Sequence, residues 1–261
     1  MSGTQWKSVL VTGASSGLGR ALAEVLAAPG VTLHLSGRDA ARLEATAEVC
    51  RARGAMVAPR VVSVTDAPAM AEWIAQAGRL DLVIANAGIS GGTGDAVEPA
   101  AQAAQVFATN LTGVLNTALP AIEAMAAQAP GTDGLRGRVA VVASIAAFVA
   151  SPSAPAYCAS KAAVQRWAEA LDASERRRGI RLHAVCPGFI RTPMTARNPF
   201  RMPGLMTPEQ AARRTLEGIA AGRVRVVYPW GLYALARLTG ALPPAWRNAM
   251  MGRLPAKPTA D

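Results

Sequence analysis

The strongest constraint on the fold is the alternation of short apolar runs with longer helical patterns along most of the chain. Seven apolar runs have the length and near-continuous hydrophobicity of buried strands, at residues 8–12, 32–36, 56–62, 82–85, 138–143, 181–186 and 223–228. Helical periodicity occupies residues 17–28, 40–53, 67–77, 101–126, 156–178 and 208–221. Apolar strands joined by helical crossovers are typical of parallel sheets covered on both faces. The sequence therefore predicts an α/β, doubly wound fold with a seven-stranded parallel sheet.

Length and composition favour one large domain. Of the 261 residues, 51% are hydrophobic and 17% are charged, which is enough apolar material for a sizeable core. We expect one domain over residues 1–228 and a tail over 229–261, rich in Trp and Leu. The tail packs on the domain, on a neighbouring subunit or on a membrane surface. No uninterrupted apolar stretch of about 18 residues occurs and no signal-like leader is seen, so we expect a cytoplasmic protein.

The net charge of +10 raises the question of nucleic-acid binding. However, 24 of the 27 basic residues are arginines spread along the whole chain, and aromatic residues are not interleaved with them. We therefore predict no nucleic-acid partner. The three cysteines are widely spaced and form neither a metal-ligand nor a disulfide pattern, so we predict no metal.

A glycine-rich turn follows the first predicted strand and leads into a helix, with the sequence Thr12-Gly13-Ala14-Ser15-Ser16-Gly17-Leu18-Gly19. Glycines there let a pyrophosphate approach the backbone, and the helix N-terminus offers unpaired N–H groups to it. The second strand ends in Ser36-Gly37-Arg38-Asp39. An arginine at this place pairs with the 2′-phosphate of NADP, so we predict NADP(H), with NAD(H) as the alternative. Asp39 fits an N-cap for the next helix. The fold is thus of the Rossmann type.

Tyr157 and Lys161 lie one turn apart on a predicted helix and point to the same face. A phenol has a pKa of about 10, and a nearby ammonium favours its ionised form. The pair therefore predicts proton transfer to a carbonyl, or from an alcohol, near neutral pH.

Taken in order, these motifs resemble the short-chain dehydrogenase/reductase family over residues 7–228. The further matching pieces are Asn86-Ala87-Gly88, Asn110, Ser144, Tyr157-Cys158-Ala159-Ser160-Lys161 and Pro187-Gly188 with Thr192. The catalytic residues that the resemblance implies are Asn110, Ser144, Tyr157 and Lys161. The cofactor-binding residues that it implies are Gly13, Ser15, Ser16, Gly17, Leu18, Gly19, Arg38, Val64, Asn86, Ala87, Gly88, Tyr157, Lys161, Pro187, Gly188, Ile190 and Thr192. It also implies a homodimer or homotetramer formed through the helices at 101–126 and 156–178.

The resemblance implies a role for each catalytic residue. Ser144 polarises the substrate oxygen, Lys161 also holds the nicotinamide ribose, and Asn110 holds a water that links the lysine to solvent. From the residue alone, Asn110 also fits a local kink in a long helix. One departure weakens the match, because Ser63 stands where the family commonly has an aspartate that contacts adenine. The backbone of Val64 can still serve there.

The substrate end is expected to form from residues 88–95, 146–155 and an irregular flap at 188–207. Its apolar residues predict a largely apolar pocket: Phe148, Val149, Met194, Phe200, Met202, Leu205 and Met206. Arg191, Arg197 and Arg201 in the flap fit either an acidic substrate group or solvated surface. We predict an NADP(H)-dependent oxidoreductase acting on an apolar carbonyl or alcohol, with Tyr157 as general acid/base. The alternatives are a cofactor-binding sensor or scaffold without turnover, and a peripheral membrane reductase of lipid-like substrates.

Overall fold

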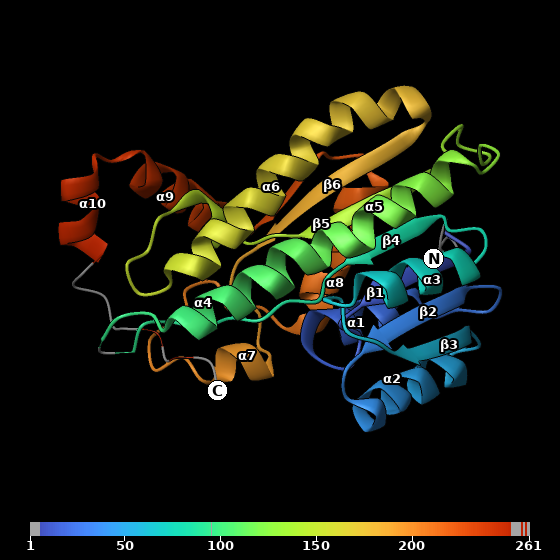
Figure 1. Ribbon diagram of the computed structural model, residues 1–261, viewed down its shortest axis with the longest axis horizontal. Helices are drawn as coiled ribbons and strands as arrows, with labels where there is room; N and C mark the ends of the chain where they lie inside the picture. Colours follow the sequence, from blue (N-terminus) through green and yellow to red (C-terminus); the bar gives the residue numbers. More distant parts are fainter. Residues whose placement is uncertain (1–5, 95, 252–256, 258, 260–261) are drawn as a thin grey trace.

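A seven-stranded parallel sheet forms the centre of the molecule (Figure 1). The computed structural model describes residues 6–94, 96–251, 257 and 259. Within this part of the chain the strand order is β3-β2-β1-β4-β5-β6-β7, and every pairing is parallel. The strands are β1 (Ser8–Thr12), β2 (Thr32–Gly37), β3 (Met56–Val61), β4 (Leu82–Ala85), β5 (Gly137–Val142), β6 (Ile180–Pro187) and β7 (Arg225–Tyr228). The predicted α/β, doubly wound fold is confirmed, with each strand within two residues of its predicted ends.

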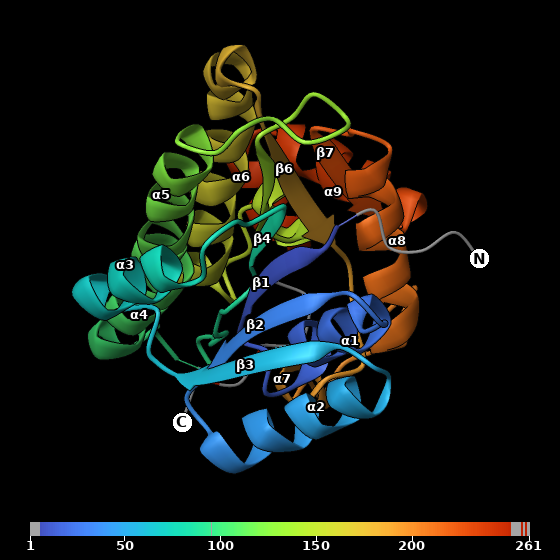
Figure 2. The same cartoon turned by 90° about the vertical axis from the view of Figure 1, so that its right-hand side faces the viewer.

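Helices cover both faces of this sheet, as Figure 2 shows, with α3, α4, α5 and α6 on one side and α1 and α8 on the other. The helices before the flap are α1 (Gly17–Leu26), α2 (Ala40–Ala52), α3 (Ala67–Gln76), α4 (Ala100–Phe107), α5 (Gly113–Ala126) and α6 (Pro155–Glu175). After it come α8 (Pro208–Ala220), α9 (Trp230–Ala241) and α10 (Pro244–Met251). Successive side chains of a strand point to opposite faces of the sheet. Val9 and Val11 belong to the core under α1, while Leu10 belongs to the core under α5, and all three are fully buried.

The outermost strand, β3, departs from the buried pattern of the others. Met56 and Val61 at its ends are 62% and 58% exposed. Pro59 interrupts its hydrogen-bonding capacity, which an edge strand tolerates because one side has no partner strand.

Two long predicted helices are subdivided. The helix expected over 101–126 is broken by a π-helical turn, η1 (Ala108–Thr112), which contains Asn110. The helix expected over 156–178 ends in a 3₁₀ turn, η3 (Arg176–Arg178), which Gly179 terminates with a φ of 76°. The flap, expected to be irregular, contains the short helix α7 (Pro193–Ala196).

The tail begins with α9, which packs on the domain. The Tyr233 ring meets Phe148 edge-on at a centroid distance of 4.9 Å, and its hydroxyl accepts a 2.7 Å hydrogen bond from Arg225. The opposite face of α9 is exposed, with Trp230 at 69% and Leu238 at 71%. Contact of that face with another subunit or a membrane stays a prediction, and tail residues 252–256, 258, 260 and 261 lie outside the described residues. No helix in the described ranges has the length and hydropathy needed to cross a membrane.

Candidate active site

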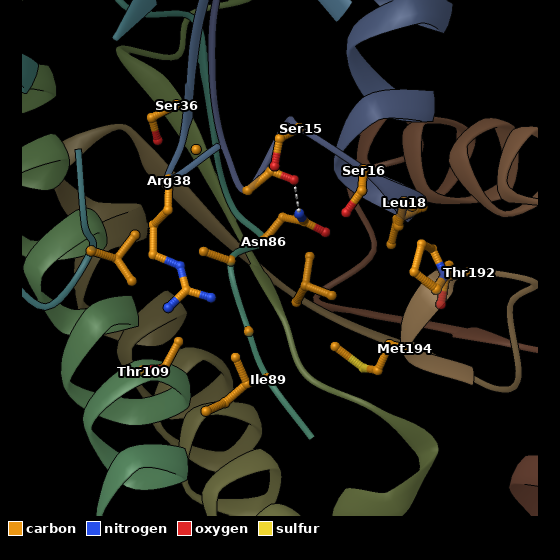
Figure 3. A pocket seen from close by; sticks show the side chains of 18 of the residues that line it. Ser15, Ser16, Leu18, Ser36, Arg38, Asn86, Ile89, Thr109, Thr192 and Met194 are labelled. Atoms are coloured by element: carbon orange, nitrogen blue, oxygen red, sulfur yellow. Dashed lines mark hydrogen bonds between the residues drawn. The ribbon is translucent and has the colours of Figure 1, made fainter. Parts of the chain in front are cut away.

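The carboxyl ends of the central strands open into a cavity of about 570 Å³ (Figure 3). Nearly all of the predicted site residues line it. They are Gly13, Ser15, Ser16, Gly17, Leu18, Arg38, Val64, Asn86, Ala87, Gly88, Ser144, Tyr157, Lys161, Pro187, Gly188, Ile190 and Thr192. Gly19 and Asn110 lie outside this lining. One cavity therefore joins the glycine turn to the tyrosine–lysine pair, where parallel α/β sheets bind ligands.

The turn between β1 and α1 needs its glycines for close approach. Gly13 has a φ of 67°, and a Cβ on it would lie 2.9 Å from the Ala87 Cα. Gly17 has a φ of 55°, and a Cβ on it would lie 3.0 Å from the Thr192 side chain of the flap. A Cβ on Gly19 would overlap the Gly13 carbonyl oxygen, so Gly19 packs the helix against the turn behind the cavity wall.

Thr12, which sequence reasoning did not single out as a site residue, ties this turn to β4. Its hydroxyl accepts hydrogen bonds from the backbone N–H groups of Asn86 (3.0 Å) and Ala87 (3.1 Å). The Asn86 side chain in turn donates to the Thr12 carbonyl at 2.9 Å. The signal in the sequence was a hydroxyl residue placed directly between a buried strand and the glycine turn.

The start of α1 is suited to an anion. Ser16 is its N-cap, yet the Ser16 side chain makes no capping hydrogen bond to the helix. Ser15, Ser16 and Gly17 line the cavity, so the N-terminal amides of the helix face open space there. The glycine cradle and these amides fit the pyrophosphate of a dinucleotide.

Arg38 reaches the cavity from the end of β2, and its side chain is exposed. Asp39 is the N-cap of α2, as expected, and accepts from the Arg42 N–H at 2.9 Å. The Arg42 guanidinium also bonds this carboxylate at 2.6 Å and, with the backbone N–H, holds the pKa of Asp39 below its usual range. Arg42 itself lines the cavity, four residues after Arg38, and sequence reasoning missed it. Two guanidinium groups therefore flank this end of the cavity.

Directly after β3, where the family commonly has an aspartate, this chain has a small cluster of hydroxyl side chains. The Ser63 hydroxyl lies 2.8 Å from the Thr65 hydroxyl, and both residues line the cavity. The carbonyl of Val64 accepts a 2.9 Å hydrogen bond from the Asn116 side chain, which fixes this loop. Val64 is thus held at the cavity wall without an aspartate beside it.

Tyr157 and Lys161 project from the first turns of α6 into the cavity, opposite Ser144 at the end of β5. The Lys161 nitrogen lies 6.0 Å from the centre of the Tyr157 ring and donates to the Val142 carbonyl at 2.8 Å. The Ser144 hydroxyl accepts from the Ala146 N–H at 3.1 Å, which orients it at the strand end.

The protonation of the pair differs from expectation. Burial raises the pKa of Tyr157, with hydrogen bonding by Ser144 acting in the opposite direction. Burial also lowers the pKa of Lys161 to about 8. The expected lowering of the phenol pKa by the ammonium is not found, because Lys161 is itself desolvated and turned toward the Val142 carbonyl. Helical spacing places both groups on one face, but it does not fix the direction of the lysine.

Asn110 is fully buried beside this pair rather than in the cavity. Its side chain accepts from the Ile89 N–H at 2.8 Å and donates to the Ile89 carbonyl at 2.9 Å. A Cβ on Gly88 would lie 3.2 Å from the Asn110 oxygen and 3.3 Å from the Lys161 nitrogen. Only a glycine therefore separates the two side chains, and the π-helical turn brings Asn110 there.

The flap closes one side of the cavity and is anchored at its base. Ile190 pairs with Met206 in an isolated parallel bridge. Thr192 caps α7 in a reciprocal capping box with Thr195. The arginines of the flap, Arg191, Arg197 and Arg201, are all exposed. Among the described residues, no group of three or more His, Cys, Asp or Glu side chains is arranged to hold a metal ion.

A family model described as short chain dehydrogenase matches residues 7–201 of the chain. The chain belongs to the short-chain dehydrogenase/reductase family. This confirms the resemblance, and with it the expectation of an NAD(P)-dependent oxidoreductase acting on CH–OH groups or the corresponding carbonyls.

Relatives and solved structures agree over most of the chain. An uncharacterized oxidoreductase of Myxococcus xanthus (strain DK1622) is 36% identical over 258 residues, covering 97% of this chain and 100% of that protein. A family member from Burkholderia phymatum, solved in complex with NAD, has a TM-score of 0.79 and 25% identity over 100% of both chains. An actinorhodin polyketide ketoreductase with NADPH has a TM-score of 0.75 and 27% identity, covering 89% of this chain and 99% of that one. Solved structures of family members thus contain NAD in one case and NADPH in another.

Proposed function

We propose that this short-chain dehydrogenase/reductase is an NADP(H)-dependent carbonyl reductase in which Tyr157 donates the proton. The observation that carries the proposal is the single cavity that holds Arg38 and Arg42 at one end and Ser144, Tyr157 and Lys161 at the other. Such a cavity can bind a phosphorylated dinucleotide and place a carbonyl against a phenol.

The preference for NADP(H) rests on charge. Arg38 and Arg42 both line the adenosine end, and the carboxylate that would favour NAD, Asp39, is engaged as the N-cap of α2. Arginine binds a phosphate through several N–H groups in a fixed planar arrangement. The free carboxylate needed to accept from a ribose 2′-hydroxyl is therefore replaced by two cations.

The other cofactor roles follow from position along the cavity. Gly13, Ser15, Ser16, Gly17, Leu18 and Gly19 form or support the pyrophosphate cradle. Val64, Asn86, Ala87 and Gly88 line the adenosine and ribose side. Pro187, Gly188, Ile190 and Thr192 hold the nicotinamide. When bound, the reduced nicotinamide supplies the hydride that reaches the carbonyl carbon.

The raised pKa of Tyr157 favours reduction. A phenol kept protonated at neutral pH is a proton donor, and its oxygen becomes anionic after donation. The Ser144 hydroxyl is placed to hold the carbonyl oxygen toward this phenol. The Lys161 ammonium stabilises the phenolate that donation leaves behind, and Asn110, next to it across Gly88, positions the lysine and its route to solvent.

Assembly and location are part of the proposal. Exposed apolar side chains on α4 and α5, Phe107 at 37% and Leu119 at 47%, support a homodimer or homotetramer formed through α4, α5 and α6. The three cysteines are free and buried, which supports a cytoplasmic location. The apolar carbonyl expected as substrate fits Ile89, Ile190 and Met194, which line the cavity.

The test is a panel of aldehydes, ketones and the matching alcohols, followed by NADPH absorbance and repeated with NADH. We expect carbonyl reduction with a kcat/KM at least tenfold higher for NADPH than for NADH, the effect of one charge-assisted contact of about 1.4 kcal/mol. Equal use of both cofactors contradicts the NADP(H) assignment, and absence of turnover across the panel contradicts the reductase.

A further inference from the structure

Lysine is rare in this chain, yet two of its lysines lie against the catalytic tyrosine. The chain has 27 basic residues, of which only Lys7, Lys161 and Lys257 are lysines. Lys161 belongs to the active site described above. Lys257 comes from the far end of the tail, and its nitrogen lies 4.6 Å from the centre of the Tyr157 ring, closer than that of Lys161.

Lys257 is held there by contacts from its backbone and its side chain. Its carbonyl oxygen accepts a 2.8 Å hydrogen bond from the Gly94 N–H. Its ammonium donates to the Ser90 hydroxyl on the same loop after β4. A Cβ on Gly92 would overlap the Lys257 carbonyl group, so the loop accepts this residue only because position 92 is a glycine.

The ammonium of Lys257 has no anionic partner in the described part of the chain. None of the ion pairs found there includes it, and burial lowers its pKa. Glu98 and Lys257 shift the pKa of the Cys158 thiol in opposite directions, so both lie near that thiol. The Glu98 carboxylate, however, binds other groups. It accepts from the Ala156 N–H at 3.0 Å and from Gln102 at 3.2 Å. A half-buried cation held by a hydroxyl and a ring face retains the capacity to bind an anion.

We propose that Lys257 is the specificity-determining residue of the substrate end, and that the substrates carry a carboxylate close to the carbonyl that is reduced. This inference rests on the reductase function proposed above. With Tyr157 at the carbonyl and Lys257 over the tyrosine ring, the two groups of an oxo acid meet a proton donor and a cation side by side. The net charge of +10 also attracts such substrates from solution.

The experiment compares oxo acids, with zero to three methylene groups between carbonyl and carboxylate, with their methyl esters. The full-length protein and its Lys257→Met, Lys257→Arg and Lys7→Met variants are assayed with NADPH. We expect the unmodified protein to prefer at least one acid over its ester by about ten- to a hundredfold in kcat/KM, the range for a hydrogen bond to a charged group. Lys257→Met removes this preference and Lys257→Arg retains part of it. Lys7→Met, an exposed lysine next to β1, leaves it unchanged.

Gly92→Ala tests the geometry without altering the lysine. The added methyl group displaces the Lys257 backbone, so this variant should lose the preference for acids as Lys257→Met does. An acid-to-ester ratio that is the same in the unmodified protein and in Lys257→Met overturns the inference. An equal rise of kcat/KM on acids and esters in Lys257→Met also overturns it, because the lysine then obstructs the site.

A binding measurement separates this inference from the reductase proposal. Ligand-observed NMR with benzoate and benzamide reports binding without turnover. Benzoate binding that weakens about tenfold in Lys257→Met, with benzamide unaffected, supports the anion site even if no carbonyl is reduced. In that case the reductase proposal fails and the cation site stands. Turnover with neutral carbonyls and no lysine-dependent benzoate binding overturns the cation site and leaves the reductase proposal standing.

Discussion

The two ends of the cavity are built in different ways. The nucleotide end consists of the turn at 13–19, the end of β2, and the segment after β4. It is formed by glycines and by hydrogen bonds between side chains and backbone, such as those joining Thr12 to Asn86. The end that the proposed function assigns to the substrate lies next to the loop at 89–94, the flap and Lys257. It is formed by side-chain contacts between distant segments, with Lys257 and Ser90 separated by 167 residues. Under the proposed function, the sheet fixes the cofactor site, while tertiary contacts decide the substrate.

Tyr157 lies where the two ends meet, so its replacement gives the largest expected effect. Tyr157→Phe removes the proton donor and should lower kcat by roughly a thousandfold, within the range known for general acids. NADPH affinity, measured by fluorescence titration, should change only slightly because the nucleotide end is untouched. Tyr228→Phe is the matched control, since that buried hydroxyl bonds Thr215 away from the pocket lining. A protein that keeps its biological output without this phenol is a sensor and not an enzyme.

Raising the pH should affect activity and stability in opposite directions through Lys161. Its folded pKa is about 8, below the ordinary value of 10.5, so between these values the unfolded chain binds more protons. The contribution of this group to the free energy of unfolding therefore rises with pH across that window, by up to about 3 kcal/mol. Carbonyl reduction should instead decline as the pH passes about 8, because the ammonium that stabilises the phenolate is lost.

Denaturant melts and pH–rate profiles of the unmodified protein and Lys161→Met check both parts. The variant should lack the rise in stability between the folded pKa of about 8 and the ordinary value of 10.5. If activity falls only at pH values at which the protein also unfolds, Lys161 is not the cation that stabilises the phenolate.

At the nucleotide end, Arg38→Asp should lower kcat/KM with NADPH by about ten- to a hundredfold and leave NADH use unchanged. The reason is that the substitution replaces a cation with an anion where the 2′-phosphate is expected. Arg42→Gln should have a smaller effect, since Arg42 shares its charge with Asp39. Arg51→Gln, on α2 but outside the cavity, is the control. Equal losses with both cofactors show that the arginine is structural.

The packed character of the nucleotide end predicts a stability effect at Gly19. In Gly19→Ala the new methyl group overlaps the Gly13 carbonyl, so the free energy of unfolding should fall by about 1–3 kcal/mol. NADPH affinity should fall with it. Gly231→Ala in α9 places its methyl group in open space and should leave stability unchanged or raise it by up to about 1 kcal/mol. Urea unfolding measures the difference in free energy of unfolding between the two variants. Equal stabilities would show that the turn at Gly19 relaxes to accept the methyl group.

The flap should show the smallest effect. Phe200 packs edge-on against Phe189 at 6.2 Å within the flap and is half-buried. Phe200→Ala should change KM for the carbonyl a few-fold and the free energy of unfolding by less than about 1 kcal/mol, because little of the central core depends on it. A large loss of stability in this variant would show that the flap is part of the core and not a cover.

The difference between the two ends also explains what the sequence could predict. The ends of β1 and β4 are where the apolar runs placed them, and the N-cap role of Asp39 is confirmed, because these depend on local patterns. Arg42 had a usable signal, since it lies four residues after Arg38 and thus near it on the start of a helix. Lys257 had none, because no local pattern connects it to Ser90. The pKa of Tyr157 depends on burial and on the direction of Lys161, which helical spacing does not determine.

The π-helical turn at Ala108–Thr112 has a consequence for the surface of the long helix that it interrupts. A π turn holds one residue more than an α turn, so every side chain from Gly113 onward is rotated by about 100° relative to an unbroken helix. The buried residues of α4, such as Val106, and those of α5, such as Val114 and Ala118, can therefore face the same core although their spacing departs from that of one unbroken helix. A single-residue deletion within the turn would rotate α5 relative to α4, withdraw Asn110 from Ile89 and turn the exposed face of α5 to a different direction. If the proposed function and assembly hold, one inserted residue couples the position of Asn110 to the orientation of the outer face of α5.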